Sequence, residues 1–289
     1  MISVIITSYK EPKTIVKAIA CIGNQSPDEI IVVAPDKETL DAAKSMIRKF
    51  KQLRIIKDDG EGKPAALNLA VKEARGDILV LTDGDVVVEK DSIKKLVEKL
   101  EDDKYGAVSG NPISLNSRNN KFGFWAYMLT EIANKRREKA ALSGKRFFCS
   151  GYLFAIRKNL FPIIPENLLS EDGFISHKVY EKGYKIAYAK ESKVYVKYPN
   201  NFSDWIKQKK RSAGGYNQIK KMLGVEIRSF RSESSGAFDF LNYISSMKEI
   251  YWLVSLFVAR VYLWLLIYKD INIKNKDQKE LWQRIESTK

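Results

Sequence analysis

Short hydrophobic runs alternate with amphipathic segments along the first 85 residues of the chain. The runs are rich in branched apolar residues and end at polar or glycine residues, which is typical of buried strands in a parallel sheet. We expect strands at 3–7, 29–33, 53–56 and 78–82, separated by helices at 12–22, 37–50 and 63–74. This alternation predicts an α/β fold with a mostly parallel sheet sandwiched by helices.

The pattern becomes looser after residue 85. Further strands are expected at 107–109, 152–156, 184–188 and 193–197, with helices at 121–141 and 170–182. From residue 202 onward the sequence is mostly helical. We therefore divide the chain into an α/β ligand-binding domain at 1–200 and a C-terminal helical region at 201–289.

One segment of the helical region, residues 250–268, is apolar at every position except Ser255 and Arg260. Its length suits a membrane span. However, the central arginine would cost about 2.5–3.5 kcal/mol on insertion scales. A single span would also export the six Lys/Arg of 269–289, against the positive-inside tendency. The pattern favours a helix lying in or against a membrane, and leaves open a true span or a buried or oligomer-forming helix.

The net charge of +15 is concentrated in two segments. Residues 118–147 carry 8 basic and 2 acidic side chains, residues 193–289 carry 18 and 9, and the remainder is neutral. A phosphate-bearing substrate, an acidic membrane surface or nucleic acid would suit such patches, as would a solvated lysine-rich surface. No nucleic-acid recognition module is visible, so we expect no nucleic-acid partner.

The two cysteines, Cys21 and Cys149, show no paired Cys/His spacing. They argue against a disulfide scaffold and a zinc module, and they fit a reducing compartment. The start of the chain has no basic leader before its apolar run, so we interpret it as a first strand and not as a signal peptide.

The strand at 78–82 stops at two carboxylates, Asp83 and Asp85, with Gly84 between them. Open α/β sheets place their ligands at the carboxyl ends of the strands. Two hard oxygen ligands at this spacing suit Mg²⁺ or Mn²⁺, with phosphate oxygens completing the shell. Taken alone, the motif is equally compatible with an ordinary Asp-Gly turn.

Other polar residues follow the remaining strands of the predicted sheet. The loop at 58–68 contains two glycines and Lys63, a combination that suits a phosphate, although such loops are commonly only turns. We interpret Asp58 and Asp59 as solvated turn residues. Residues after the first two strands that would share this edge are Ser8, Glu11 and Asp36.

Two helix starts carry further candidates. Ser170-Glu171-Asp172 has the form of an N-cap with acidic first-turn residues, but Asp172 would also serve as a general base for a hydroxyl nucleophile. Gln208 and Arg211 are three residues apart and share a helix face. The arginine there would bind a pyrophosphate bidentately, while a plain basic amphipathic helix explains the same residues.

In this order, the segments TSYKEP, GKPAALN, ILVLTDGD, SED and QKKR resemble the motifs of the family 2 inverting glycosyltransferases. The resemblance covers about residues 2–215 and is closest to the membrane-associated branch of cellulose, chitin and hyaluronan synthases. It implies a GT-A-type, Rossmann-like fold with a C-terminal helical appendage. It also implies a nucleotide-diphosphate-sugar donor, with UDP favoured, and a Mg²⁺ or Mn²⁺ cofactor.

The resemblance also implies a role for each candidate residue. Asp172 would be the catalytic base, Asp85 would contact the metal, and Asp83 would contact both the nucleotide and the metal site. The residues that would bind the nucleotide or its pyrophosphate are Ser8, Glu11, Asp36, Lys63, Asn68, Asp83, Gln208 and Arg211. Two departures from the family pattern are that Ala34-Pro35 precedes Asp36 and that Ser212 replaces the tryptophan of the last motif. The second departure favours the addition of one sugar over processive polymerisation.

The expected partners are therefore a nucleotide-diphosphate sugar, a glycan or lipid-linked acceptor with a free hydroxyl, and a membrane surface. The expected location is cytoplasmic, at the inner face of the membrane. Three other functions stay open: a polyprenyl-phosphate glycosyltransferase, a sugar-nucleotide pyrophosphorylase and a non-enzymatic nucleic-acid-binding protein. A pyrophosphorylase would need a glycine loop after the first strand, and TSYKEP contains no glycine.

Overall fold

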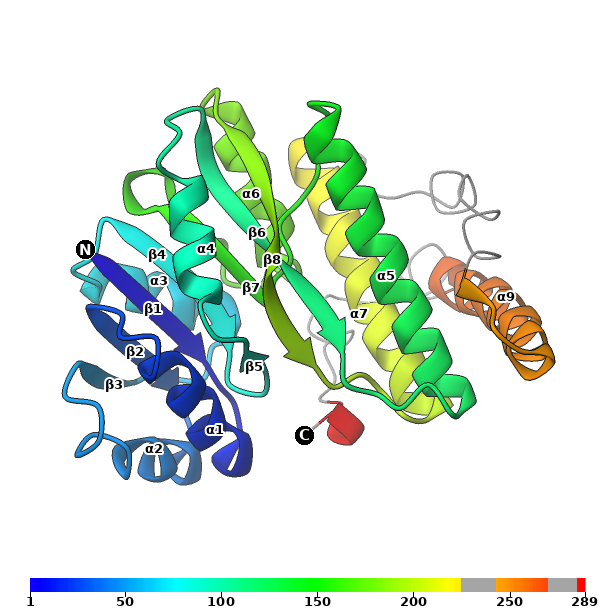
Figure 1. Cartoon of the computed structure of the whole chain (residues 1–289), viewed down its shortest axis with the longest axis horizontal. Helices are drawn as coiled ribbons and strands as arrows, with labels where there is room; N and C mark the ends of the chain where they lie inside the picture. Colours follow the sequence, from blue (N-terminus) through cyan, green and yellow to red (C-terminus); the bar gives the residue numbers. More distant parts are fainter. Residues whose placement is uncertain (225–242, 270–284, 289) are drawn as a thin grey trace.

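The structure is a computed structural model that describes residues 1–224, 243–269 and 285–288. It contains an eight-stranded sheet with the order β3-β2-β1-β4-β7-β6-β8-β5 and helices on both faces (Figure 1). The strands are β1 (Ile2–Thr7), β2 (Glu29–Ala34), β3 (Leu53–Lys57), β4 (Ile78–Asp83), β5 (Val87–Val88), β6 (Tyr105–Ser114), β7 (Leu153–Arg157) and β8 (Lys185–Val196). The predicted α/β sandwich is confirmed.

The sheet is parallel on its N-terminal side and mixed on the other. β1 pairs in parallel with β2 and β4, and β2 pairs in parallel with β3. β7 runs antiparallel to β4 and β6, β5 runs antiparallel to β8, and β6 and β8 are parallel. Because β1 and β4 are parallel and in register, Thr7 and Asp83 lie opposite each other at their carboxyl ends.

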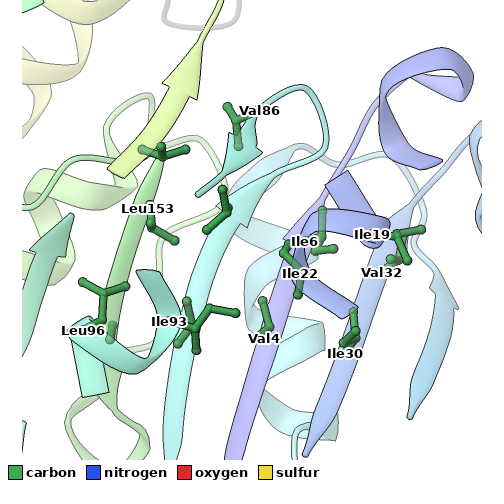
Figure 2. Packing of buried hydrophobic residues seen from close by; sticks show 14 of the residues in the cluster. Val4, Ile6, Ile19, Ile22, Ile30, Val32, Val86, Ile93, Leu96 and Leu153 are labelled. Atoms are coloured by element: carbon green, nitrogen blue, oxygen red, sulfur yellow. The ribbon is translucent and has the colours of Figure 1, made fainter. Parts of the chain in front are cut away.

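Alternating side chains of the buried strands supply two separate cores. Val4 and Ile6 of β1 pack on one face, whereas Ile5 packs on the other. This period of two follows from the strand backbone, which points successive side chains to opposite faces. Figure 2 shows the first core, where Val4 and Ile6 lie near Ile19 and Ile22 of the neighbouring helix.

The first core is covered by α1 (Pro12–Gly23), α2 (Lys37–Lys44) and α4 (Ser92–Lys99). The second is covered by α3 (Lys63–Glu73) and α6 (Glu171–Glu181), with Ile219 of α7 (Phe202–Leu223) at its margin. Two short 3₁₀ turns complete the described elements, η1 (Lys158–Leu160) and η4 (Glu286–Thr288). Helices α1, α2 and α3 directly follow the parallel strands β1, β2 and β3, so they begin at the carboxyl ends of these strands.

A third core joins α5 (Lys121–Leu142), α7 and α9 (Met247–Tyr268) beside the sheet (Figure 1). Arg118 Nε lies 2.6 Å from Glu249 Oε1, and the Trp125 indole donates a 2.8 Å hydrogen bond to the carbonyl of Trp252. In the part of the chain that the structure describes, α9 is the one helix long and apolar enough to cross a membrane, and 28% of its most apolar window is buried.

Four predicted elements differ from the observed ones. The strands expected at 184–188 and 193–197 form the single strand β8, because its parallel pairing with β6 resumes beyond an irregularity at Ser109–Asn111. The same pairing extends the strand expected at 107–109 to Tyr105–Ser114. The helix expected at 37–50 ends at Lys44, and tighter turns connect it to the buried Phe50.

Candidate active site

Lys63 links the two acidic motifs of the candidate site. Its ammonium nitrogen lies 2.7 Å from Asp83 Oδ1, at the end of β4, and 2.7 Å from Glu171 Oε1, at the start of α6. Burial alone would lower the pKa of Lys63, but the charges of Asp83 and Glu171 outweigh burial and raise it. The loop after β3, the end of β4 and the start of α6 therefore meet around one fixed positive charge.

Glu171 is a site residue that the sequence analysis did not single out. It lies next to the proposed base Asp172, and an acidic residue in the first turn of a helix is common for reasons of stability alone. Its contact with Lys63 joins positions that are 108 residues apart in the chain, so no local pattern identifies it. The only available signal was its place within the SED segment.

The segment after β1 packs directly against the Asp83–Asp85 turn. The Ser8 hydroxyl donates a 2.6 Å hydrogen bond to Glu11 Oε2, and both side chains are buried. A Cβ atom added at Gly84 would lie 2.4 Å from Ser8 Oγ and 2.8 Å from Glu11 Oε2. The glycine is therefore required for this close approach, which brings two of the sequence-predicted residues to the carboxylate turn.

Asp36 lies beside the same segment. Its Oδ2 accepts a 2.7 Å hydrogen bond from the backbone N–H of Lys10, and its Oδ1 accepts one of 2.9 Å from that of Thr39, capping α2. Burial would raise the pKa of Asp36, but these donors, led by the Lys10 N–H, outweigh it and lower the pKa. Asp36 is thus ionised and fixed in orientation at the carboxyl end of β2.

The interpretation of Asp58 as a solvated turn residue is wrong. Its side chain is 6% exposed, and its Oδ1 has no hydrogen-bond partner among the residues that the structure describes. The chain turns back onto β2 here, since the Asp58 N–H donates to the carbonyl of Ala34. Burial raises the pKa of Asp58, and the nearby carboxylates Asp59 and Asp36 add to this effect.

Asn68 uses its amide to connect α3 with the loop before α6. Its Nδ2 donates a 2.8 Å hydrogen bond to the carbonyl of Ile164, and its Oδ1 accepts one of 3.0 Å from the N–H of the same residue. These bonds hold α3, and therefore Lys63 at its first turn, in place. The role of Asn68 at the nucleotide stays a prediction.

The Asp172 carboxylate is held by three donors. Its Oδ1 accepts hydrogen bonds of 2.8 Å from the Ser170 hydroxyl and from the Gly173 N–H, and its Oδ2 accepts one of 3.1 Å from the Gly151 N–H. Gly215 of α7 packs so closely on this segment that an added Cβ would lie 2.7 Å from Ser170 Cβ. The three hydrogen bonds fix the orientation of the carboxylate. Asp172 also lines a cavity.

Tyr152, the residue before β7, interacts electrostatically with charged groups of both α7 and the carboxylate turn. Burial raises the pKa of its phenol, Tyr198 adds to the effect, and the Arg211 guanidinium opposes it, while Asp85 and Asp83 raise it further. Arg211 and the two aspartates are therefore within electrostatic range of one phenol. Gln208, one helical turn before Arg211, lines the cavity that contains Asp172. The structure thus brings Gln208 of the QxxR segment to the cavity that contains Asp172.

Asp83 and Asp85 are the two carboxylates that the sequence analysis assigns to a divalent cation at this edge. Within the described ranges, the structure contains no group of three or more His, Cys, Asp or Glu side chains that could hold a metal ion. Two carboxylates with a bound diphosphate match the way Mg²⁺ is held at phosphate sites, where the ion keeps few protein ligands. The donor set fits such an ion, and Lys63 already balances one of the two charges.

A cavity of about 770 Å³ opens from Asp172 between α5, α7 and α9. Near the proposed base, its lining includes Ser150, Tyr152 and Gly173. The rest of the lining contains both apolar and basic side chains. Ala126, Ala133 and Ala140, on one face of α5, are among the small apolar ones. A substrate larger than a water molecule can therefore approach Asp172 from the side of the helical region.

Comparison with known proteins gives a consistent result. Residues 3–162 match the Glycosyl transferase family 2 model, a range that includes the carboxylate turn and Lys63. The chain is 27% identical over 220 residues to the O-antigen chain rhamnosyltransferase RfbN of Salmonella typhimurium, covering 70% of this chain and 67% of that protein. It is 22% identical over 226 residues to the poly-beta-1,6-N-acetyl-D-glucosamine synthase of Staphylococcus aureus, covering 75% of this chain and 55% of the synthase.

The family match covers more than half of the 289 residues and includes three of the five segments, TSYKEP, GKPAALN and ILVLTDGD. The resemblance to family 2, expected from five short segments in order, is confirmed. The chain belongs to glycosyl transferase family 2 and is a glycosyltransferase.

Proposed function

We propose that the protein is an inverting transferase that moves one sugar from a nucleotide-diphosphate sugar to a hydroxyl of a glycan or lipid-linked acceptor. The observation that carries the proposal is the Lys63 bridge, which joins the Asp83–Asp85 turn to the segment that presents Asp172. A donor diphosphate bound at the turn would therefore lie next to a fixed carboxylate. The relatives' names, one a rhamnosyltransferase and one a polysaccharide synthase, support a role in assembling a surface glycan.

The donor would lie across the carboxyl ends of β1, β2 and β4. Ser8, Glu11 and Asp36 would line the base and ribose side, and the carboxylates of Glu11 and Asp36 would accept hydrogen bonds from base N–H or ribose O–H groups. Lys63 would face the diphosphate, with Asn68 holding the helix that carries it. UDP is the nucleotide that the family resemblance favours.

Mg²⁺ or Mn²⁺ would be held by Asp83 and Asp85 together with the donor diphosphate. When bound, the ion would neutralise negative charge on the diphosphate. Two cationic side chains of the protein would neutralise the same negative charge. Arg211 would pair with diphosphate oxygens in bidentate fashion, and Lys63 is kept charged by its two carboxylate partners.

The transfer itself is a single displacement at the anomeric carbon. The acceptor oxygen forms the new C–O bond, its proton passes to Asp172, and the bond from the anomeric carbon to the diphosphate oxygen breaks with its electron pair leaving on the diphosphate. Attack from the face opposite to the leaving group inverts the anomeric centre. The three hydrogen bonds to Asp172 would orient it for this proton transfer, and Oδ2 accepts one of the three.

The presence of a fixed base favours a hydroxyl acceptor over a polyprenyl phosphate. A phosphate oxygen is already ionised at neutral pH and gains little from a general base, whereas a sugar hydroxyl must lose a proton as it attacks. Product analysis distinguishes the two, because a glycosyl phosphate is labile to mild acid and a glycosidic bond to a sugar hydroxyl is far more stable.

We also propose that α9 lies on the cytoplasmic face of a membrane. Its buried positions pack on α5 and α7, while the opposite positions are apolar and exposed. The exposed fractions include 71% for Tyr251, 65% for Val258 and 65% for Leu265. An apolar face of this length, flanked by basic residues, is typical of helices that lie in the membrane interface.

A thermal-shift screen of nucleoside diphosphates with and without Mn²⁺ tests the donor proposal. A ligand at 100 times its dissociation constant stabilises the native state by about 2.7 kcal/mol. We expect one nucleoside diphosphate, UDP first, to raise the Tm by several degrees only when Mn²⁺ is present. Equal shifts with nucleoside monophosphates, or no dependence on the metal, would refute binding at the Asp83–Asp85 turn.

A further inference from the structure

The cavity beside Asp172 has a composition that the transfer reaction alone does not require. Its described lining contains one carboxylate, Asp172, and a set of six cations from three helices and a loop: Arg136, Arg137, Arg146, Lys209, Lys220 and Arg260. Positive charge at this density in a partly enclosed space favours a ligand with more than one negative charge. The cavity's net charge is thus opposite to that of a phosphate or diphosphate.

The apolar part of the wall is equally specific. α5 contributes small alanines at seven-residue intervals, and α9 contributes Leu263, Trp264 and Ile267. Residues at intervals of seven share one helix face, and on this face of α5 the alanines alternate with larger lining residues such as Leu129 and Arg136. A neutral glycan would prefer polar partners throughout, whereas a hydrocarbon chain would be accommodated by the apolar part of this wall.

Arg260 explains how the cavity relates to the membrane-facing helix. This arginine interrupts the apolar segment, and it lines the cavity together with Leu263 and Ile267. The exposed apolar positions of α9, such as Val258 and Leu265, lie on other faces of the same helix. A ligand that enters from a membrane beneath α9 would keep its apolar part along that helix and its charge near Arg260.

We propose that the cavity binds the lipid-phosphate part of the acceptor, so that the acceptor is a saccharide carried on a long-chain lipid phosphate or diphosphate. The inference rests on the proposed transferase function and names its acceptor class. The cations bind the linking phosphate, the apolar lining residues of α5 and α9 accommodate the start of the lipid chain, and the sugar hydroxyl extends to Asp172.

Binding of geranylgeranyl diphosphate to the full chain, measured by tryptophan fluorescence in the presence of EDTA, tests this assignment. Inorganic pyrophosphate and geranylgeraniol serve as the isolated head and chain. We expect the diphosphate lipid to bind at least 10-fold more tightly than either. We expect Arg136→Gln and Arg260→Gln each to weaken its binding about 10-fold, while Lys51→Gln, at an exposed position outside the cavity, has no effect.

Several results would overturn the assignment. If geranylgeraniol binds as tightly as geranylgeranyl diphosphate, the site recognises only the hydrocarbon chain. If inorganic pyrophosphate binds as tightly, the site recognises only the phosphate groups. Displacement of the probe by phosphatidylglycerol vesicles would assign the cations to bilayer lipid. Wild-type affinity in both arginine variants would place the probe elsewhere. The metal-dependent nucleotide shift is measured separately, so its failure would refute the donor proposal and not this one.

Discussion

The ammonium nitrogen of Lys63 lies 2.7 Å from Asp83 Oδ1, an oxygen of one of the two carboxylates that we propose as metal ligands. The same nitrogen contacts Glu171, next to the proposed base. A single side chain thus connects the donor end of the site to the acceptor end. Any cation that binds Asp83 must share this carboxylate with the lysine or displace it.

Replacing Lys63 by Met should raise the affinity for Mn²⁺ in the absence of nucleotide. The ammonium repels a divalent ion and occupies one oxygen of Asp83, so its removal should tighten binding about fivefold or more. Electron paramagnetic resonance titration of free Mn²⁺ measures this. Lys57→Met, at the exposed end of β3, is the control and should leave the affinity unchanged. An unchanged affinity in the Lys63 variant would mean that Asp83 is not a metal ligand.

Replacing Asp172 by Asn should remove transfer while donor binding persists. The amide keeps the size of the side chain but cannot take up the acceptor proton, and general-base catalysis contributes about 10²–10⁴-fold. We expect kcat/KM to fall by this factor and the nucleotide Kd to change less than about threefold. Glu166→Gln, at an exposed site on the preceding loop, should retain wild-type transfer. Near wild-type transfer by the Asp172 variant would disprove the base assignment.

The parts of the site that follow strand ends could be predicted from the sequence. Buried strands in a parallel sheet produce continuous apolar runs, and a run that ends in Asp83-Gly84-Asp85 locates both the strand and its ligand edge. The helix starts at Lys63 and Glu171 follow equally local signals. For Asp83, Asp85 and Lys63 both the chemistry and the position are encoded within a few neighbouring residues, whereas for Glu171 only the helix start is.

The remainder depends on contacts that no local pattern encodes. Asn68 bonds the backbone of a residue 96 positions away, and Glu171 meets Lys63 across a similar separation. Asp58 is polar and stands beside glycines, which is typical of a solvated turn, yet the fold of the chain onto Ala34 buries it. The cavity likewise exists only because α5, α7 and α9 pack together.

Replacing Gly84 by Ala should damage both stability and donor binding. The added methyl group would lie 2.4 Å from Ser8 Oγ, so the segment after β1 must shift, and overpacking of this kind costs about 1–3 kcal/mol. We expect nucleotide affinity to fall with stability, as measured by calorimetry and urea unfolding. Gly144→Ala meets no atom within 4 Å and should cost only about 1 kcal/mol, for its positive φ, without an effect on the nucleotide.

Glu29 provides a test of the fold that is independent of the site. This carboxylate at the start of β2 is 3% exposed, lies 2.6 Å from Arg54, and accepts hydrogen bonds from the Ser3 hydroxyl and the Arg75 N–H. Burial would raise the pKa of Glu29, but the Arg75 N–H, the Ser3 hydroxyl and the Arg54 charge together lower it. A carboxyl group whose pKa is lowered on folding stabilises the native state above its unfolded pKa of about 4.3.

Replacing Glu29 by Gln should therefore reduce the free energy of unfolding by about 2–3 kcal/mol near neutral pH, since hydrogen bonds to a buried charge are lost. The difference from wild type should shrink as the pH falls from 6 toward 3, because the wild-type carboxylate then becomes protonated through its lowered pKa. Urea unfolding across this range measures the effect. Glu73→Gln, which removes the exposed second partner of Arg54, should cost less than about 0.5 kcal/mol. A pH-independent difference for the Glu29 variant would contradict an ionised Glu29 in the native state.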